Sequence, residues 1–164
     1  MGKRILIIGC PGSGKSYLSV ELSKKTKIPC FHIDNLYWNP DKTHIERDEL
    51  IKKYNDIFKL DEFILEGNYQ ATLEYRVKYA STIIFLDFSL DDCIKGIRER
   101  TNKERSDIPW IQNEEDGEQL IDWIKEFDTR EKPVIINTLN SFKGEVIILH
   151  NKEEVNEYLK KEIE

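Results

Sequence analysis

Short apolar runs recur along the chain, and the segments between them carry apolar residues at helical spacing. Five runs have the length and continuous hydrophobicity of buried strands, at residues 3–8, 30–33, 62–65, 82–88 and 145–149. Strands that alternate with helices pair in parallel, because each helix returns the chain to the same end of the sheet. The pattern therefore predicts an α/β fold with a five-stranded parallel sheet.

Amphipathic helices are expected between these strands and at the end of the chain. Apolar residues share one face over residues 50–58 and again over residues 120–127. The last helix is expected to begin after Asn151, whose side chain suits an N-cap and is followed three residues later by Glu154.

The first strand runs directly into a phosphate-binding motif. Residues 9–16 read Gly-Cys-Pro-Gly-Ser-Gly-Lys-Ser and satisfy the pattern G-x-x-x-x-G-K-[ST] in full. The glycines let backbone N–H groups close around phosphate oxygens, Lys15 neutralises the β/γ charge, and the Ser16 hydroxyl is a ligand for Mg²⁺. The motif predicts that ATP and Mg²⁺ bind to this loop, through Gly9, Pro11, Gly12, Ser13, Gly14, Lys15 and Ser16.

Composition narrows the class of protein. The chain has 164 residues, of which 39% are hydrophobic, and no stretch approaches the roughly 20 apolar residues that span a bilayer. The chain starts with a core strand and not a signal peptide, so we expect a cytoplasmic protein. Cys10, Cys30 and Cys93 are scattered and do not cluster with the histidines, so we expect reduced, structural cysteines and no zinc site.

Charge and missing motifs leave kinases as the favoured class. The formal net charge of −6 argues against a dedicated nucleic-acid binder, which would show a basic footprint. The N-K-x-D and D-x-x-G motifs of GTPases are absent, and the chain is too short for an ABC-type ATPase or helicase. A nucleotide or small-molecule kinase fits the size and the early phosphate loop.

Three further runs, at residues 33–38, 63–69 and 82–88, resemble the adenylate-kinase-like proteins of the DNA topology modulation, or FlaR-related, family. The resemblance covers most of the chain, weakens after Arg105, and implies the fold of nucleoside monophosphate kinases, with strand order 2-3-1-4-5 and helices on both faces. The sequence departs from the family at Glu66, where Asp is usual, and at Gly96, where Arg is common. Because the family name refers to an effect on DNA topology, the alternative is a nucleotide-dependent regulatory protein without a small acceptor.

Two segments interrupt the alternation of strands and helices. Residues 34–41 are rich in turn residues, and residues 101–117 lack a sustained period. Both are expected at the carboxyl edge of the sheet, where parallel α/β folds bind ligands. We therefore expect one domain over residues 1–164, with an acceptor-side insertion near 34–60 and a lid-like segment near 101–117.

The first of these segments contains the candidate acceptor site. Asp34 stands at the end of a strand, where shikimate-type and gluconate-type kinases use a carboxylate to hold the acceptor hydroxyl. A carboxylate there can orient the hydroxyl and accept its proton, or it can simply cap the turn. Tyr37 and Trp38 can stack on a base or sugar, or anchor the loop to the core.

A carboxylate and a glycine follow the third strand. In the expected strand order, Glu66 lies beside the phosphate-loop strand and is the candidate to hold Mg²⁺ through water. Gly67 would let the backbone approach a bound acceptor, although a turn glycine is the plainer interpretation. Asp87 is the rival metal partner and is expected to be structural.

Arginines matter because a guanidinium can hold two oxygens of a phosphoryl group at once. Arg76 is the candidate for gripping an anionic group of the acceptor. Arg100 and Arg105 flank the start of the lid-like segment and are expected to reach ATP when that segment closes. For each arginine, a solvated surface position is the alternative.

Overall fold

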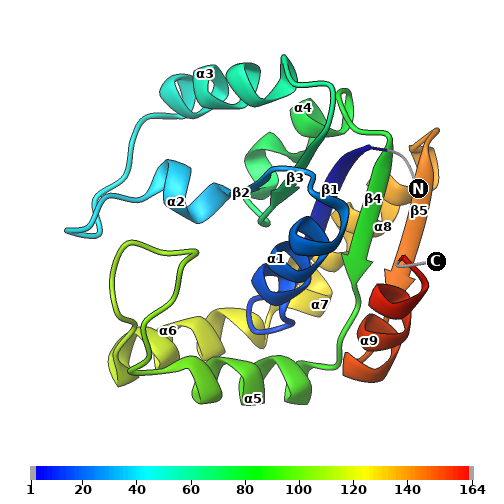
Figure 1. Ribbon diagram of the computed structural model, residues 1–164. Coiled ribbons are helices and arrows are strands. Elements are labelled where there is room, and N and C mark those ends of the chain that lie inside the picture. The colour runs from blue at the N-terminus through cyan, green and yellow to red at the C-terminus, as the bar shows by residue number, and fades with distance from the viewer. Residues whose placement is uncertain (1–2, 163–164) are drawn as a thin grey trace.

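Five strands form a single parallel sheet in the computed structural model, which describes residues 3–162 (Figure 1). The strand order is β2-β3-β1-β4-β5, and all four pairings are parallel. The strands are β1 (Arg4–Gly9), β2 (Cys30–His32), β3 (Phe63–Glu66), β4 (Thr82–Leu86) and β5 (Glu145–Leu149). The fold class and the strand order expected from the sequence are confirmed.

The three central strands are buried on both faces. The side chains from Ile5 to Ile8 in β1 are all at most 1% exposed, and those of β3 and β4 are buried as well. Burial on both faces explains why these strands are apolar throughout instead of alternating. The strand β5 lies at the edge and leaves Val146 and Ile148 partly exposed.

Helices cover both faces of this sheet, with α1 in front of it and α8 behind it in Figure 1. Within residues 3–162, no helix combines the length and the apolar character that a membrane span requires. The helices are α1 (Lys15–Thr26), α2 (Ile33–Tyr37), α3 (Arg47–Phe58), α4 (Leu73–Val77), α5 (Leu90–Arg100), α6 (Glu114–Ile124), α7 (Phe127–Arg130), α8 (Lys132–Ser141) and α9 (Lys152–Lys161), with a 3-10 turn η1 at Gln70–Thr72.

Side-chain caps set the start of two helices near the site. Asn113 and Asp116 form a reciprocal capping box at the start of α6, so the irregular segment after α5 ends at residue 113, four residues earlier than its lack of period indicated. Asn151 accepts a hydrogen bond from the backbone N–H of Glu154 and caps α9, as its position in the sequence predicts.

The phosphate loop packs directly on α5 through two glycines. A Cβ added to Gly96 would lie 2.1 Å from the carbonyl oxygen of Gly12, and one added to Gly12 would lie 2.1 Å from that of Cys93. Both contacts are with backbone, which cannot swing aside as a flexible side chain would. The glycine at 96, where the topology modulation family often has arginine, thus lets the loop lie against the helix.

This contact predicts whether a substitution at Gly96 raises or lowers the stability of the protein. Gly96→Ala in a helix interior would ordinarily stabilise by about 1 kcal/mol, but here the methyl group would push the phosphate loop away. We expect the free energy of unfolding, measured by chemical denaturation, to fall by about 1–3 kcal/mol, the usual range for overpacking. Asn156→Ala, at an exposed position of α9, is the control and should keep or raise stability. Equal behaviour of the two variants would contradict the packing argument.

Candidate functional site

The phosphate loop connects β1 to α1 and presents the start of that helix to open space. Gly14 is the N-cap of α1, whose first turn has neither a side-chain cap nor an acidic residue. A Cβ added to Gly14 would meet no atom of the described residues within 4 Å. The backbone N–H groups at this helix end are therefore available to an anion, and the helix dipole favours one.

Several buried donors around this loop lack a partner. The buried side-chain atoms without a hydrogen-bond partner among the described residues are Ser13 Oγ, Asn68 Nδ2 and Arg100 Nε. Ser13 belongs to the loop, Asn68 accepts a hydrogen bond from the backbone N–H of Gly9, and Arg100 stands where the irregular segment begins. All three atoms can donate a hydrogen bond, so the donor set suits the oxygens of a polyphosphate.

Ser16 lies between two buried carboxylates. Its Oγ is 3.2 Å from Oε1 of Glu66 and 2.8 Å from Oδ2 of Asp107. Glu66 is at the end of β3, in register with Ile7 of β1, and is therefore beside the loop as the strand order predicts. Oxygen ligands of this kind suit Mg²⁺. The predicted metal-site residues Ser16 and Glu66 are in contact, and the fit to Mg²⁺ is supported by their chemistry.

Asp107 comes from the irregular segment and is paired with Arg105. The guanidinium donates from Nε to Oδ1 at 2.9 Å and from Nη2 to Oδ2. Burial alone would raise the pKa of Asp107, but the hydrogen bonds from Arg105 and Ser16 and the charge of Arg105 hold it below its usual value. Asp107 is therefore ionised, and it brings the irregular segment into the phosphate site.

His32 accompanies Glu66 from the neighbouring strand β2. Its Nδ1 lies 3.0 Å from Oε1 of Glu66. Burial favours the neutral ring, but the hydrogen bonds with Cys30 and Glu66 prevail and raise the pKa of His32 to about 10. An imidazolium at neutral pH offsets the buried negative charge of Glu66.

Asp34 is in the first turn of α2, next to this cluster. It remains accessible to solvent, but the protein around it removes much of its water and, together with the charge of Glu66, raises the pKa of Asp34 to about 6. The backbone at Gly67 packs closely against Ile33, since a Cβ added to Gly67 would lie 2.8 Å from the Cβ of Ile33. Gly67 thus lets β3 approach the residue that precedes Asp34.

Arg76 has a different environment from the other arginines. Its side chain is 0% exposed and donates to the carbonyl oxygens of Gly67 and Tyr69 and to Oγ1 of Thr72. Burial lowers the pKa of Arg76 to about 10, so it stays charged at neutral pH. In this arrangement the guanidinium binds the backbone that follows β3.

Arg100 lies at the end of α5, half-buried and without a partner for its Nε among the described residues. Burial and the neighbouring charge of Arg105 lower the pKa of Arg100 to about 10. A half-buried guanidinium whose buried Nε lacks a partner could donate that hydrogen bond to a phosphate group.

The acceptor-side and lid-like segments contact each other across the site. Asn35 Nδ2 donates to the carbonyl oxygen of Ser106 at 2.6 Å, and Lys42 Nζ lies 2.9 Å from the carboxylate of Asp116. The ring centroids of Trp38 and Trp110 are 5.7 Å apart, edge to face. Two segments about 70 residues apart in the chain are thus held together (Figure 1).

Tyr37 and Trp38 belong to an aromatic group at this junction. Tyr37 stacks on His44 with centroids 4.7 Å apart and lies at the same distance from Tyr69. Asp87, at the end of β4, is 2.8 Å from Lys132 of α8, which is consistent with the structural role expected for it.

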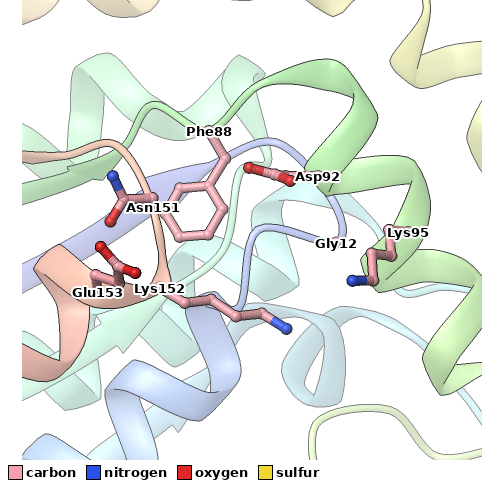
Figure 2. A pocket seen from close by; sticks show the side chains of 7 residues that line it. All are labelled: Gly12, Phe88, Asp92, Lys95, Asn151, Lys152 and Glu153. Carbon is pink, nitrogen blue, oxygen red and sulfur yellow. The ribbon is translucent and has the colours of Figure 1, made fainter.

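A cavity of about 370 Å³ lies on the other side of the phosphate loop, between α5 and the start of α9 (Figure 2). Figure 2 shows the Phe88 ring at its wall, with Lys95 and Lys152 extending from opposite elements. The lining residues are Gly12, Phe88, Asp92, Lys95, Asn151, Lys152 and Glu153.

The fold resembles a known kinase structure. Shikimate kinase from Bacteroides thetaiotaomicron matches with a TM-score of 0.63 over 96% of this chain and 94% of that chain, at 14% sequence identity. This likeness shows that the chain shares the fold of that protein. Neither a protein-family model nor a curated protein matches the chain, so the resemblance to the topology modulation family stays a prediction.

Some residues of this site could not be predicted from the sequence. Asp107 and His32 meet Ser16 and Glu66 only in the folded chain, and an aspartate in an irregular segment carries no local signal of burial. Among the cavity residues after β5, the sequence predicts a role only for Asn151, as a helix cap, because no motif marks Lys152 or Glu153.

Arg76 gives the first test at this site. Arg76→Lys keeps the charge but cannot reach all three oxygen acceptors, so buried carbonyl groups lose their partners. We expect a loss of about 2 kcal/mol or more in the free energy of unfolding, measured by chemical denaturation. Lys78→Arg, at the C-cap of α4, is the control and should be neutral. If stability is unchanged and only acceptor binding weakens, Arg76 grips the acceptor directly, as the sequence predicts.

Proposed function

We propose that this protein is a kinase that transfers the γ-phosphoryl group of MgATP to a nucleotide or a small hydroxyl-bearing acceptor. The observation that carries the proposal is the meeting of Ser16, Glu66 and Asp34 with the lid arginines at one edge of a P-loop kinase fold. Support also comes from the structural neighbour, which is named as a shikimate kinase.

The phosphate loop would hold the triphosphate of ATP. Lys15 Nζ donates to the carbonyl oxygen of Cys10 at 3.1 Å and can exchange this neutral partner for phosphate oxygens. Ser16, with Glu66 through water, would hold Mg²⁺, which supplies neutralisation of the phosphate charge when bound. The orphaned donors of Ser13 and Arg100 would find acceptors in the same ligand.

The nucleoside end of ATP would occupy the cavity beside Gly12. The cavity adjoins the loop that binds the phosphates, and the Phe88 ring offers a flat apolar surface for a base (Figure 2). Lys95 and Lys152 add positive charge near the phosphates.

The acceptor would lie against Asp34. A carboxylate with a pKa near 6 is still ionised at neutral pH and is a stronger base than an ordinary aspartate. It can orient an acceptor hydroxyl and take its proton as the phosphoryl group is transferred. For a nucleotide acceptor, whose attacking phosphate oxygen is already ionised, Asp34 would act in binding instead.

Arg100 and Arg105 would balance the charge that spreads over the transferring phosphoryl group. Both stand at the start of the segment that contacts the acceptor side through Asn35 and Ser106. Tyr37 and Trp38 would close the acceptor site, and Arg76 would fix the backbone at Gly67, which packs against Ile33.

The test is a screen of nucleoside monophosphates, nucleosides and small polyols for acceptor-stimulated ADP release. Lys15→Ala is the control protein, because it removes the phosphate-neutralising charge from a position that the core does not use. An acceptor that stimulates wild type and not this variant supports the proposal. Absence of MgATP binding by calorimetry, or duplex-DNA binding that persists at raised salt without any acceptor turnover, would favour the regulatory alternative.

The role of Asp34 predicts a pH dependence. Protonation removes the base, so kcat/KM for a hydroxyl acceptor should fall as the pH is lowered through about 6, the pKa of Asp34. Asp34→Asn should lower turnover by about 100-fold or more and should lack this acidic limb. Its MgATP affinity should stay near that of wild type, because the phosphate loop is unchanged.

Asp48→Asn, at an exposed carboxylate in the first turn of α3, serves as the matched control. The control should keep both the turnover and the acidic limb of wild type. If Asp34→Asn keeps its turnover and its acceptor affinity, Asp34 is not part of the active site.

A further inference from the structure

The lid-like segment delivers a carboxylate into the place where the phosphate loop would hold its metal. Asp107 and Glu66 are 4% and 2% exposed, and each has an oxygen within 3.2 Å of the Ser16 hydroxyl. Asp107 comes from residues 101–113, whereas Ser16 is in the first turn of α1 and Glu66 ends β3. Three chain segments that are distant in sequence thus meet at one hydroxyl group.

The spacing of these oxygens suits a shared cation as well as it suits hydrogen bonding. A serine hydroxyl has one proton, so it cannot donate fully to two carboxylates at once. Adjacent ligands of an octahedral Mg²⁺ ion with bonds of 2.0–2.1 Å lie about 2.9 Å apart. The distance from Ser16 Oγ to Asp107 Oδ2 is 2.8 Å.

Asp107 can accept a further partner in its present position. Arg105 donates one hydrogen bond to each carboxylate oxygen, and Ser16 contacts Oδ2. A carboxylate has about four lone-pair sites, so these contacts leave capacity for a metal ion. The Arg105 pair also orients the carboxylate toward Ser16, as hydrogen bonds to ligating carboxylates do in metal sites.

We propose that Asp107 is a magnesium ligand carried by the lid, which completes the metal site only when residues 101–113 lie over the phosphate loop. The inference rests on the proposed MgATP function and extends it, because it makes metal loading depend on lid closure. The contact of Asn35 with Ser106, next to Asp107, joins the acceptor side to the same event.

A competing interpretation makes the opposite prediction. The carboxylate of Asp107 could stand in for a phosphate group and block the loop until ATP displaces it. Removal of its charge would then strengthen ATP binding with or without Mg²⁺. Loss of a metal ligand instead reduces the gain in ATP affinity that Mg²⁺ provides.

The experiment measures ATP affinity by calorimetry as a function of Mg²⁺ concentration, and Mn²⁺ binding to the ATP-bound protein by electron paramagnetic resonance. In Asp107→Asn, the metal concentration needed for half of the affinity gain should rise about 10–100-fold, the range for disturbed metal sites. ATP affinity without metal should not fall, because the variant removes a negative charge and leaves the loop folded. Glu104→Gln, an exposed carboxylate of the same segment, should match wild type in both measurements.

A second variant covers the case in which Asp107→Asn does not fold. Asp107→Glu keeps the charge and the pairing with Arg105 but moves the carboxylate by one methylene, and should weaken only the metal-dependent affinity. Unchanged metal dependence in a folded variant, or tighter ATP binding with Mg²⁺ present, overturns the inference and leaves the proposed function intact. If wild type itself binds ATP with no gain from Mg²⁺, the proposed function fails, and the inference fails with it.

Discussion

Charge compensation at the carboxyl edge of the sheet is the constraint on which the site depends. A buried carboxylate is tolerated only where a cation or hydrogen bonds offset its lost hydration. Glu66 is offset by the imidazolium of His32, and Asp107 by the bidentate guanidinium of Arg105. Arg100 keeps an unpaired donor beside them, and Lys15 donates to a carbonyl oxygen. The cluster therefore retains positive groups that an anionic ligand can engage.

The same constraint links the two segments that interrupt the regular fold. Because Asp107 is compensated within the lid-like segment by Arg105, that segment can carry a negative charge into the phosphate site at small cost. The neighbouring Ser106 then meets Asn35, one residue from Asp34. Under the proposed function, closure over ATP and closure over an acceptor would be parts of one arrangement, which would keep water away from the transferring group.

The residues that position the site are different from the residues that are proposed to act in it. The sheet and the contact of Gly12 with Gly96 fix where the phosphate loop lies, and Arg76 fixes the backbone after β3 from a fully buried position. The residues of the proposed site stand at the ends of strands or in irregular segments, where side chains can differ without changing the core. A fold shared with a shikimate kinase at 14% identity is consistent with this division, since the likeness concerns the scaffold.

The sequence by itself determined the strands and the phosphate loop, because continuous apolar runs and a glycine-rich motif are local patterns with few structural outcomes. The strand order followed from the resemblance to nucleoside monophosphate kinases, and the structure has that order. That strand order also predicts that Glu66 lies beside the phosphate-loop strand, where the structure places it. Only the tertiary structure decided that Asp107 reaches Ser16, that the surroundings of His32 raise its pKa, and that Arg76 is buried with backbone partners. These outcomes depend on contacts between segments far apart in the chain and on the loss of water around them, and neither leaves a periodic signal in the sequence.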